Sequence, residues 1–595
     1  MNVLVLLLVA FGLFWIASRF YSRTIARILG EDPATSTPAV RFNDGRDYVP
    51  TKRYIVFAHH FSAIAGAGPI LGPTMAVLYG YVPAWLWIVF GGIFIGAVHD
   101  FTALFICMRE GGKSMAEVAR KTLGTWGFNL FLAFTILMLV LVTASFLSAT
   151  AISLTSVWPL AKISANEADT FLKTVVQDGV VMGRIGGIAS TSVIIITLAS
   201  PLLGWLIYKR GIPALPAYAL ASTICVVSVF AGIWLPVNLE PEVWMVILSI
   251  YVLFAAGTPV WFILQPRDFI NVQILYGGML LMALSVIVTG ADGLTLTAPR
   301  LNVAEGVQNL GFIWPMMFIT IACGAISGFH SLVAGGTTGK QLSKETDARK
   351  VGYNAMLLES LLAVMVLVAI CSTLKFDDYK AIVWPSDPGI KSNPILGFSL
   401  AAGHLFEQGL GIPIALGTVF GILLVEGFVI TTLDAAIRLN RYLFEELWTI
   451  LFRQPPALLK HYWFNAGMAV ILMWVLAYSN AFNRLWPIFA TANQLLAALG
   501  LLAIAAWLGC RGKRTMFVLV PAVFMVLTTV ASLLVLFKSY WERRTYTLLV
   551  ADVLLLVLSA GVIALFLRTF VTRRGTAVGA SGRIEIVATP SKPSA

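Results

Sequence analysis

About fifteen apolar segments, each long enough to cross a lipid bilayer, follow one another along this chain of 595 residues. In hydrocarbon, backbone N–H and C=O groups find no water, so a spanning segment satisfies them internally as a helix or within a closed barrel. Long apolar runs favour helices. We therefore expect an all-α polytopic membrane protein. The expected helices cover residues 2–19, 54–80, 82–107, 127–157, 186–208, 212–235, 242–265, 270–290, 311–331, 352–374, 411–433, 462–480, 484–508, 516–537 and 547–570.

Composition and charge argue against two other classes of protein. Only 12% of the residues are charged, about half the share in a soluble domain. The formal charge of +12 comes from basic residues in short loops between apolar runs, so we expect no nucleic-acid partner. The five cysteines are scattered and form no CxxC pair, which predicts neither disulfides nor a metal site.

Loop charges predict the orientation of the chain. Basic residues lie in the loops after every second helix, starting with the first, and the intervening loops are neutral or acidic. Because basic loops stay on the cytoplasmic side, we expect the N-terminus outside and the C-terminus in the cytoplasm. The basic loop from Lys538 to Arg544 is the exception. The first apolar run has no basic residues before it, so we expect an uncleaved helix rather than a signal peptide.

The second expected helix is interrupted at its centre, where the sequence from His59 to Pro73 reads HHFSAIAGAGPILGP. Proline removes a backbone donor and glycine adds no stiffness, so the helix should unwind. Freed backbone groups are tolerated in hydrocarbon only where they line a cavity or meet protein, water or substrate. Secondary transporters bind their cargo at such breaks, although a kinked, closely packed helix is the alternative. The expected substrate-binding residues are Ser62, Ala65, Gly66, Ala67, Gly68 and Pro69.

A similar sequence, FAAGTPVWFILQP, lies in the seventh expected helix, which runs in the opposite direction by the loop charges. Two interrupted spans in oppositely oriented halves indicate an inverted-repeat transporter, with chance similarity as the alternative. We expect a five-plus-five, LeuT-like core in which helices 2 and 7 are broken and Gly257, Thr258 and Pro259 complete the substrate site. The parts would be residues 1–53 (first helix and loop), 54–235 and 236–435 (the two repeats), 436–570 (additional helices) and 571–595 (disordered tail).

Ionisable and hydroxyl side chains inside the spans gather on the expected cytoplasmic side of the midplane. Such residues are costly in a membrane and indicate function, and histidine or a desolvated carboxylate can exchange protons near neutral pH. The expected proton- or ion-coupling residues are His59, His60, His99, Asp100, Ser327, His330, Ser331 and Glu426.

Some of these residues also allow simpler interpretations. His59 and His60 are adjacent and point to different faces of a helix, so they cannot bind one metal together, and we expect no metal site. Asp434 and Arg438 are four residues apart and would pair across one helical turn. Ser327 and Ser331 share a helix face, where they would either line an ion site or bond back to their own helix.

Four motifs together resemble the carbon starvation protein A (CstA) family. They are HHFSAIAGAGPILGP from His59, LQPRDF from Leu264, SGFHSLVAGGTTGKQL from Ser327 and TTLDAAIRLNRY from Thr431. The resemblance covers residues 52–507. It implies a secondary transporter of the bacterial inner membrane, used during carbon starvation and associated with proton-coupled uptake of pyruvate and with uptake of peptides. It also implies the five-plus-five inverted repeat.

We therefore expect a multi-pass transporter, not an enzyme, that imports a small carboxylate such as pyruvate, or short peptides, by proton symport. Its partners would be that substrate, H⁺ or Na⁺, and the lipid membrane. A sodium-coupled symporter of the same architecture is the first alternative. A haem-binding redox protein is disfavoured because the six histidines offer few pairs at matching depth, so we expect no cofactor. A nutrient sensor without transport would need partner proteins, because no signalling domain is recognisable.

Overall fold

The computed structural model describes residues 1–44, 48–163, 170–259, 261–387 and 390–574. Within these residues, twelve helices are long and apolar enough to cross a membrane, and a bent helix pair makes a thirteenth span. The twelve are Val3–Leu29 (α1, η1, α2), Tyr81–Arg109 (α6, η3, α7), Met115–Ser153 (α8), Gly186–Tyr208 (α9), Ala214–Trp234 (α10), Leu264–Ala291 (α12), Arg349–Thr373 (η7, α16), Ile414–Leu451 (α19), Tyr462–Ser479 (α20), Phe482–Gly509 (α21), Met516–Glu542 (α22) and Tyr546–Thr569, which belongs to α23 (Tyr546–Arg574).

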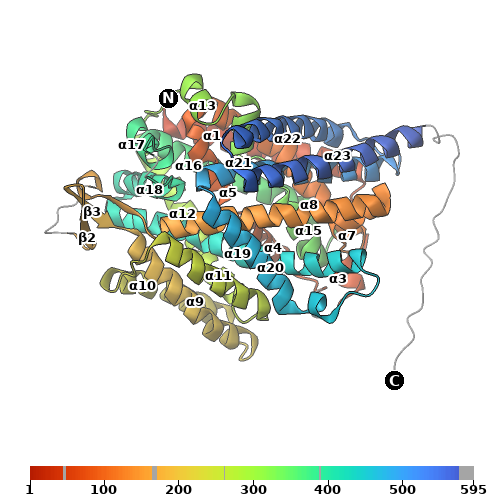
Figure 1. The fold of residues 1–595 in the computed structure, drawn as a ribbon, viewed down its shortest axis with the longest axis horizontal. Helices are drawn as coiled ribbons and strands as arrows, with labels where there is room; N and C mark the ends of the chain where they lie inside the picture. The colour runs from red at the N-terminus through yellow and green to blue at the C-terminus, as the bar shows by residue number, and fades with distance from the viewer. Residues whose placement is uncertain (45–47, 164–169, 260, 388–389, 575–595) are drawn as a thin grey trace.

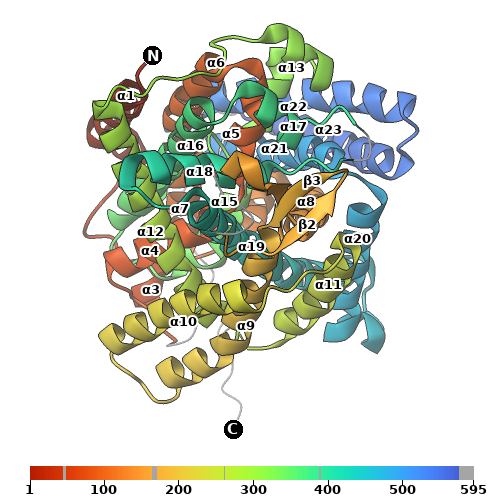
Figure 2. The same ribbon diagram turned by 90° about the vertical axis from the view of Figure 1, so that its left-hand side faces the viewer.

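The shorter elements lie mainly between the spans. They are α3 (Pro38–Arg41), α11 (Pro241–Gly257), α13 (Val303–Asn309), α17 (Phe376–Val383), α18 (Pro394–Leu410) and the antiparallel strands β1 (Val157–Pro159), β2 (Thr174–Gln177) and β3 (Val180–Arg184), in the sheet order β1-β3-β2. Strands β2 and β3 and helix α17 lie at one end of the molecule, on the left of Figure 1, and α3 lies toward the other (Figures 1 and 2).

The expectation of an all-α polytopic membrane protein is confirmed, but within the described residues fewer than fifteen helices are long and apolar enough to span a membrane. Two expected crossings do not form continuous spans: residues 242–265 contain the 17-residue helix α11, and residues 311–331 are interrupted. The expected disordered tail begins within α23, which extends to Arg574, and its residues 575–595 lie outside the described residues.

The first broken span consists of α4 (Arg53–Ile64) and α5 (Gly68–Ala76), which meet at an angle of 45°. Ala65 leaves the helical region with φ −72° and ψ 59°. Helix α5 then begins with Pro69 in its first turn, where the missing N–H costs no hydrogen bond. The break predicted from the Gly-Ala-Gly-Pro sequence is confirmed.

The predicted break of helix 7 is wrong. Helix α11 ends at Gly257, Thr258 is extended, and a separate span, α12, begins at Leu264. The residue before a proline is pushed toward extended conformations, so the Thr-Pro sequence ends the helix here instead of interrupting it. The two repeats expected from the similar interrupted sequences of helices 2 and 7 therefore lose the observation on which they rested.

A second interrupted helical segment, outside the thirteen spans counted above, lies farther along the chain. Segments η5 (Ile313–Met317) and α14 (Phe318–Thr320) precede a non-helical stretch at residues 321–328, after which α15 (Phe329–Gly336) begins. The two breaks touch. A Cβ atom added to Gly68 would lie 2.3 Å from the Cys323 sulfur, and one added to Gly72 would lie 2.9 Å from the Thr320 carbonyl oxygen.

Glycines allow neighbouring helices to approach the second break closely. Gly92 and Gly96 lie on the span Tyr81–Arg109; an added Cβ would lie 2.4 Å from the Ser360 hydroxyl oxygen at the first and 2.2 Å from the Ala325 carbonyl oxygen at the second. Small residues play this role in membrane helix packing. Helices α4, α5, α7, α15 and α16 pack into one bundle around the breaks, and α8 packs along α19 and α21 beside it.

We predict that Gly96→Ala lowers stability by about 1–3 kcal/mol, the usual cost of overpacking, because a backbone carbonyl blocks the new methyl group. Gly467→Ala in α20 is the matched control, since no atom lies within 4 Å of its added Cβ. Heat-induced unfolding of the purified proteins compares the two. Equal midpoints would mean that the approach at Gly96 is not as tight as described.

Candidate site at the meeting of two broken helices

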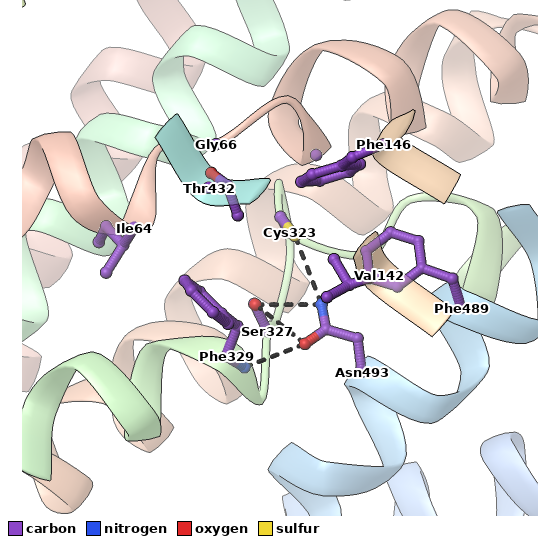
Figure 3. Close-up of a pocket in the computed structure, with 11 residues that line it drawn as sticks. Ile64, Gly66, Val142, Phe146, Cys323, Ser327, Phe329, Thr432, Phe489 and Asn493 are labelled. Atoms are coloured by element: carbon purple, nitrogen blue, oxygen red, sulfur yellow. Dashed lines mark hydrogen bonds between the residues drawn. The ribbon is translucent and has the colours of Figure 1, made fainter. Parts of the chain in front are cut away.

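A small cavity lies where the two breaks meet (Figure 3). Its volume of about 20 Å³ is enough for about one water molecule. The lining comes from both broken helical segments and from α8, α19 and α21. It consists of Ile64, Gly66, Gly68, Val142, Phe146, Cys323, Ser327, Phe329, Thr432, Phe489 and Asn493. The structure thus shows a conformation closed around the breaks, and a larger substrate requires the helices to move apart.

The carbonyl groups freed by the second break have side-chain partners from distant helices. The Trp87 indole donates to the carbonyls of Phe318 and Ile321 at 3.0 and 3.2 Å. The Trp486 indole donates to the Thr320 carbonyl at 3.2 Å, and the Gln494 amide donates to the Phe318 carbonyl at 2.8 Å. These donors satisfy backbone groups that hydrocarbon would leave unpaired.

Several N–H groups at the breaks have no partner among the described residues. In the part of the chain that the structure describes, no hydrogen bond is found from the N–H groups of Ala67, Gly68 or Cys323. Gly68 and Cys323 line the cavity, and Gly68 begins the nine-residue helix α5. Unpaired N–H groups at a helix N-terminus favour an anion. These free N–H groups would suit a carboxylate, and unpaired carbonyls, such as those of Ala65 and Cys323, lie beside them among the described residues.

Asn493 of α21 joins the second break to the C-terminal helices, a role that the sequence analysis missed. Its Oδ1 accepts from the Phe329 N–H at 3.0 Å, and its Nδ2 donates to Ser327 Oγ at 3.1 Å and to the Cys323 sulfur at 3.4 Å (Figure 3). Residues 436–570, expected only to add helices, thus supply part of the cavity. The signal available in the sequence was an uncharged amide, Asn493, inside a long apolar run.

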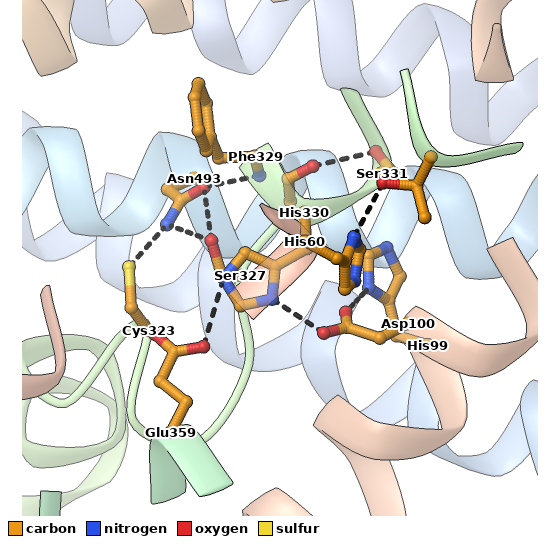
Figure 4. A network of polar contacts seen from close by, with 12 residues as sticks. His60, His99, Asp100, Cys323, Ser327, Phe329, His330, Ser331, Glu359 and Asn493 are labelled. Atoms are coloured by element: carbon orange, nitrogen blue, oxygen red, sulfur yellow. Dashed lines mark hydrogen bonds and ion pairs between the residues drawn. The ribbon is translucent and has the colours of Figure 1, made fainter. Parts of the chain in front are cut away.

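Five ionisable side chains form a buried network beside the cavity (Figure 4). Asp100 joins two histidines: its Oδ1 lies 2.8 Å from His99 Nδ1 and its Oδ2 lies 2.7 Å from His330 Nδ1. His330 Nε2 lies 3.4 Å from Glu359 Oε2, and His60 Nδ1 lies 2.9 Å from the Thr338 hydroxyl. All five side chains are at most 1% exposed. The network includes Glu359 beyond the expected coupling residues.

The other expected coupling residues lie apart from this network or bond locally. His59 is partly exposed on a different face from His60, as predicted. The Ser331 hydroxyl donates back to the Gly328 carbonyl at 2.7 Å, whereas Ser327 contacts Asn493. Glu426 of α19 accepts a hydrogen bond from Ser153 of α8, and its second oxygen has no partner among the described residues.

The expected substrate residues divide into two groups. Gly66 and Gly68 line the cavity, and Ala65, Ala67 and Pro69 are buried beside them. Ser62 is partly exposed and does not line it. Gly257, Thr258 and Pro259 do not line it either: an added Cβ at Gly257 would meet Tyr462, and Arg438 donates to the Thr258 carbonyl at 2.7 Å. The structure therefore does not bring these three residues to the break.

The expected pair of Asp434 and Arg438 does not form. Asp434 instead lies 3.1 Å from Arg267 Nη1 and accepts from the Tyr251 hydroxyl at 2.6 Å. Arg438 donates to the carbonyls of Ala255 and Thr258. Arg267 is 2% exposed. Leaving the buried guanidinium of Arg267 without a counter-charge costs more free energy than leaving the partly exposed guanidinium of Arg438 without one. Asp434 therefore pairs with Arg267 of the other helix.

We predict that Asp434→Ala destabilises the protein by about 3–5 kcal/mol, because it leaves the buried Arg267 charge unpaired. The double variant Arg267→Met/Asp434→Leu is the control, since it removes both charges and keeps apolar volume. It should recover most of the loss in heat-induced unfolding of the purified protein. A double variant no more stable than the single one would contradict the assignment of the loss to the unpaired Arg267 charge.

Within the described residues, no group of three or more His, Cys, Asp and Glu side chains is arranged to hold a metal ion. The arrangement is that of a polytopic helical membrane protein in which one broken span and a second interrupted helical segment enclose a small cavity beside a buried ionisable network.

The family expected from the four motifs is confirmed. Residues 2–388 and 381–532 match the family model described as "Carbon starvation protein CstA", so this chain belongs to that family. It is 30% identical over 587 residues to "Peptide transporter CstA" of Campylobacter jejuni, covering 89% of this chain and 79% of that protein. It is also 30% identical over 598 residues to "Pyruvate/proton symporter BtsT" of Escherichia coli, covering 87% and 79%. Its relatives are thus transporters.

Solved transporter structures show a weaker likeness. The Eremococcus coleocola manganese transporter covers 90% of this chain and 99% of its own at 13% identity and a TM-score of 0.46. MhsT in complex with L-phenylalanine covers 87% and 100% at 14% identity and the same TM-score. These values are too low to support an argument about the fold or the inverted repeat.

Proposed function

We propose that this protein is a secondary active transporter of the bacterial inner membrane that imports a small carboxylate such as pyruvate, or short peptides, by proton symport. The observation that carries the proposal is the set of unpaired N–H groups where the two broken helices meet. Pyruvate and a peptide C-terminus both present a carboxylate to such donors. The names of two relatives, a peptide transporter and a pyruvate/proton symporter, support both substrate classes.

The proton would pass through the buried network of His60, His99, Asp100, His330 and Glu359. These side chains hold alternative proton positions a short distance from Cys323 and Ser327, which line the cavity. Substrate in the cavity and protons in the network would then affect one another through the second break. Glu426, at the junction of α8 and α19, is a second candidate proton carrier because one of its oxygens is buried without a partner among the described residues.

The direct test is uptake of labelled pyruvate by proteoliposomes, with and without an inward proton gradient. Accumulation driven by the gradient supports the symporter, and competition by an unlabelled dipeptide tests for peptides. Replacing Na⁺ by choline at fixed pH tests the sodium-coupled alternative, in which Ser327 helps to hold the ion. Absence of both pyruvate flux and dipeptide-dependent proton movement would contradict the proposal.

We predict that Gly68→Ala reduces uptake at least tenfold, because the new methyl group meets Cys323 and disturbs the contact between the breaks. Gly467→Ala is again the matched control and should transport like the parent protein. Both proteins must first show equal yield and equal insertion into the vesicles. Normal uptake by Gly68→Ala would mean that transport does not depend on the close contact between the two breaks.

We predict that Asp100→Asn abolishes accumulation of substrate against its gradient and spares exchange of labelled for unlabelled substrate. The amide keeps the shape of the side chain but cannot carry the negative charge that faces two histidines. Glu426→Gln tests the second carrier in the same assay. Asp292→Asn, at an exposed position after α12, is the control. If both buried variants concentrate substrate as well as the parent protein, the assignment of the proton carriers is wrong.

A further inference from the structure

The C-terminal end of α7 carries two adjacent residues of opposite charge that bind different parts of the molecule. Arg109 binds Glu345, which is fully buried in the loop after the second broken helical segment; the two contacts measure 2.6 and 2.5 Å. Glu345 also accepts from the Asp32 N–H at 2.8 Å. Arg109 therefore ties α7 to the N-terminal segment and to the loop that follows α15.

Two backbone contacts strengthen the same group of elements. The Val49 N–H donates to the Lys340 carbonyl at 3.3 Å, and the Thr51 N–H donates to the Gln341 carbonyl at 3.0 Å. These contacts join the residues before α4 to those after α15. At this end, the two broken helical segments and α7 are thus held together as one unit.

Glu110, the next residue, binds elements outside that unit. Its carboxylate accepts from Lys121 Nζ of α8 at 2.6 Å, from the Trp507 indole of α21 at 2.6 Å, and from Arg511 Nη2, just after α21, at 2.9 Å. Partial burial alone would raise the pKa of Glu110, but the hydrogen bonds from Lys121 and Trp507 outweigh it, and the pKa lies below its ordinary value. The carboxylate is therefore charged at neutral pH.

We propose that Glu110 is a latch that closes this end of the transporter, by fastening the unit of the two broken helical segments and α7 to α8 and α21, beside a second contact from Lys513 Nζ to the Leu29 carbonyl at 2.6 Å. The inference rests on the proposed function, because a transporter with one central site must open to each side in turn. When this end opens, the contacts of Glu110 with Lys121, Trp507 and Arg511 break. The contacts between Arg109 and Glu345 stay, since both residues belong to the moving unit.

The position of Glu110 explains how the latch would control access to the cavity. It follows α7, whose Asp100 belongs to the buried network, and α8 and α21 supply Val142, Phe146, Phe489 and Asn493 to the cavity lining. Separation of α7 from α8 and α21 would therefore open the cavity along the side that carries the network. By the loop charges, this end faces the cytoplasm.

Cys323 offers a reporter for the test, because it lines the cavity and is 8% exposed. In a protein with Cys107→Ala, Cys225→Ala, Cys371→Ala and Cys510→Ser, Cys323 is the remaining thiol. A membrane-impermeant maleimide is applied to inside-out and to right-side-out vesicles. We expect Glu110→Gln to speed labelling of Cys323 about tenfold in inside-out vesicles alone, since weaker hydrogen bonds favour the open state.

The control is Glu242→Gln, which weakens an exposed ion pair with Lys391 in the loops expected on the opposite face. It should leave labelling from the inside unchanged. Equal labelling of Glu110→Gln and the parent protein, or an equal increase from both sides, would overturn the latch. If Cys323 is not labelled in any protein, hydrogen exchange decides: the amides of residues 65–68 and 321–328 should exchange faster in Glu110→Gln, and equal exchange would overturn the proposal.

The two proposals can fail separately. Faster labelling from the inside in Glu110→Gln, combined with absence of pyruvate or peptide uptake by the parent protein, would keep the latch and reject the transporter as proposed. Proton-driven uptake by the parent protein, combined with unchanged labelling and exchange in Glu110→Gln, would keep the transporter and reject the latch.

Discussion

The need to satisfy backbone groups inside the membrane governs this structure. One span and one further helical segment lose their helical hydrogen bonds, and the lost bonds must be replaced or left to face a cavity. Trp87, Trp486 and Gln494 replace the partners of the freed carbonyls in the second break. Free N–H groups remain at both breaks, next to the cavity. These N–H groups are the donors that the proposed carboxylate would use.

The same break connects ligand binding with ionisation. Residues 321–328 supply Cys323 and Ser327 to the cavity, and His330 follows two residues later at the start of α15, bonded to Asp100. Any change that moves this stretch alters both the cavity and the geometry of the network. At the end of α7, Arg109 and Glu110 separate the elements that would move together from those that would stay. In the proposed function, binding, proton exchange and closure would all involve two neighbouring segments, Tyr81–Arg109 and residues 313–336.

Local sequence was enough to predict the first break, because Gly-Ala-Gly-Pro disfavours a helix in any context. It was not enough for the second. Residues 321–328 contain no proline, and their unwound form depends on indole and amide groups from helices far away in the chain. Conversely, the sequence Gly-Thr-Pro at residues 257–259 was expected to interrupt a helix, but it ends one. Glycine and proline disfavour a helix in both situations, so the local sequence does not distinguish an interruption from an end. Likewise, a local pair such as Asp434 and Arg438 contributes only about 0.2–0.5 kcal/mol, less than the need of the buried Arg267 for a counter-charge.

The most direct test of the account is whether substrate protects Cys323. In the purified protein with Cys323 as its remaining thiol, alkylation is measured at increasing concentrations of pyruvate and, separately, of a dipeptide. If substrate binds where the two broken helices meet, the transported compound slows alkylation, with half-protection at the concentration that half-saturates uptake. Unchanged alkylation at saturating concentrations of a compound that the same protein transports would place the substrate elsewhere.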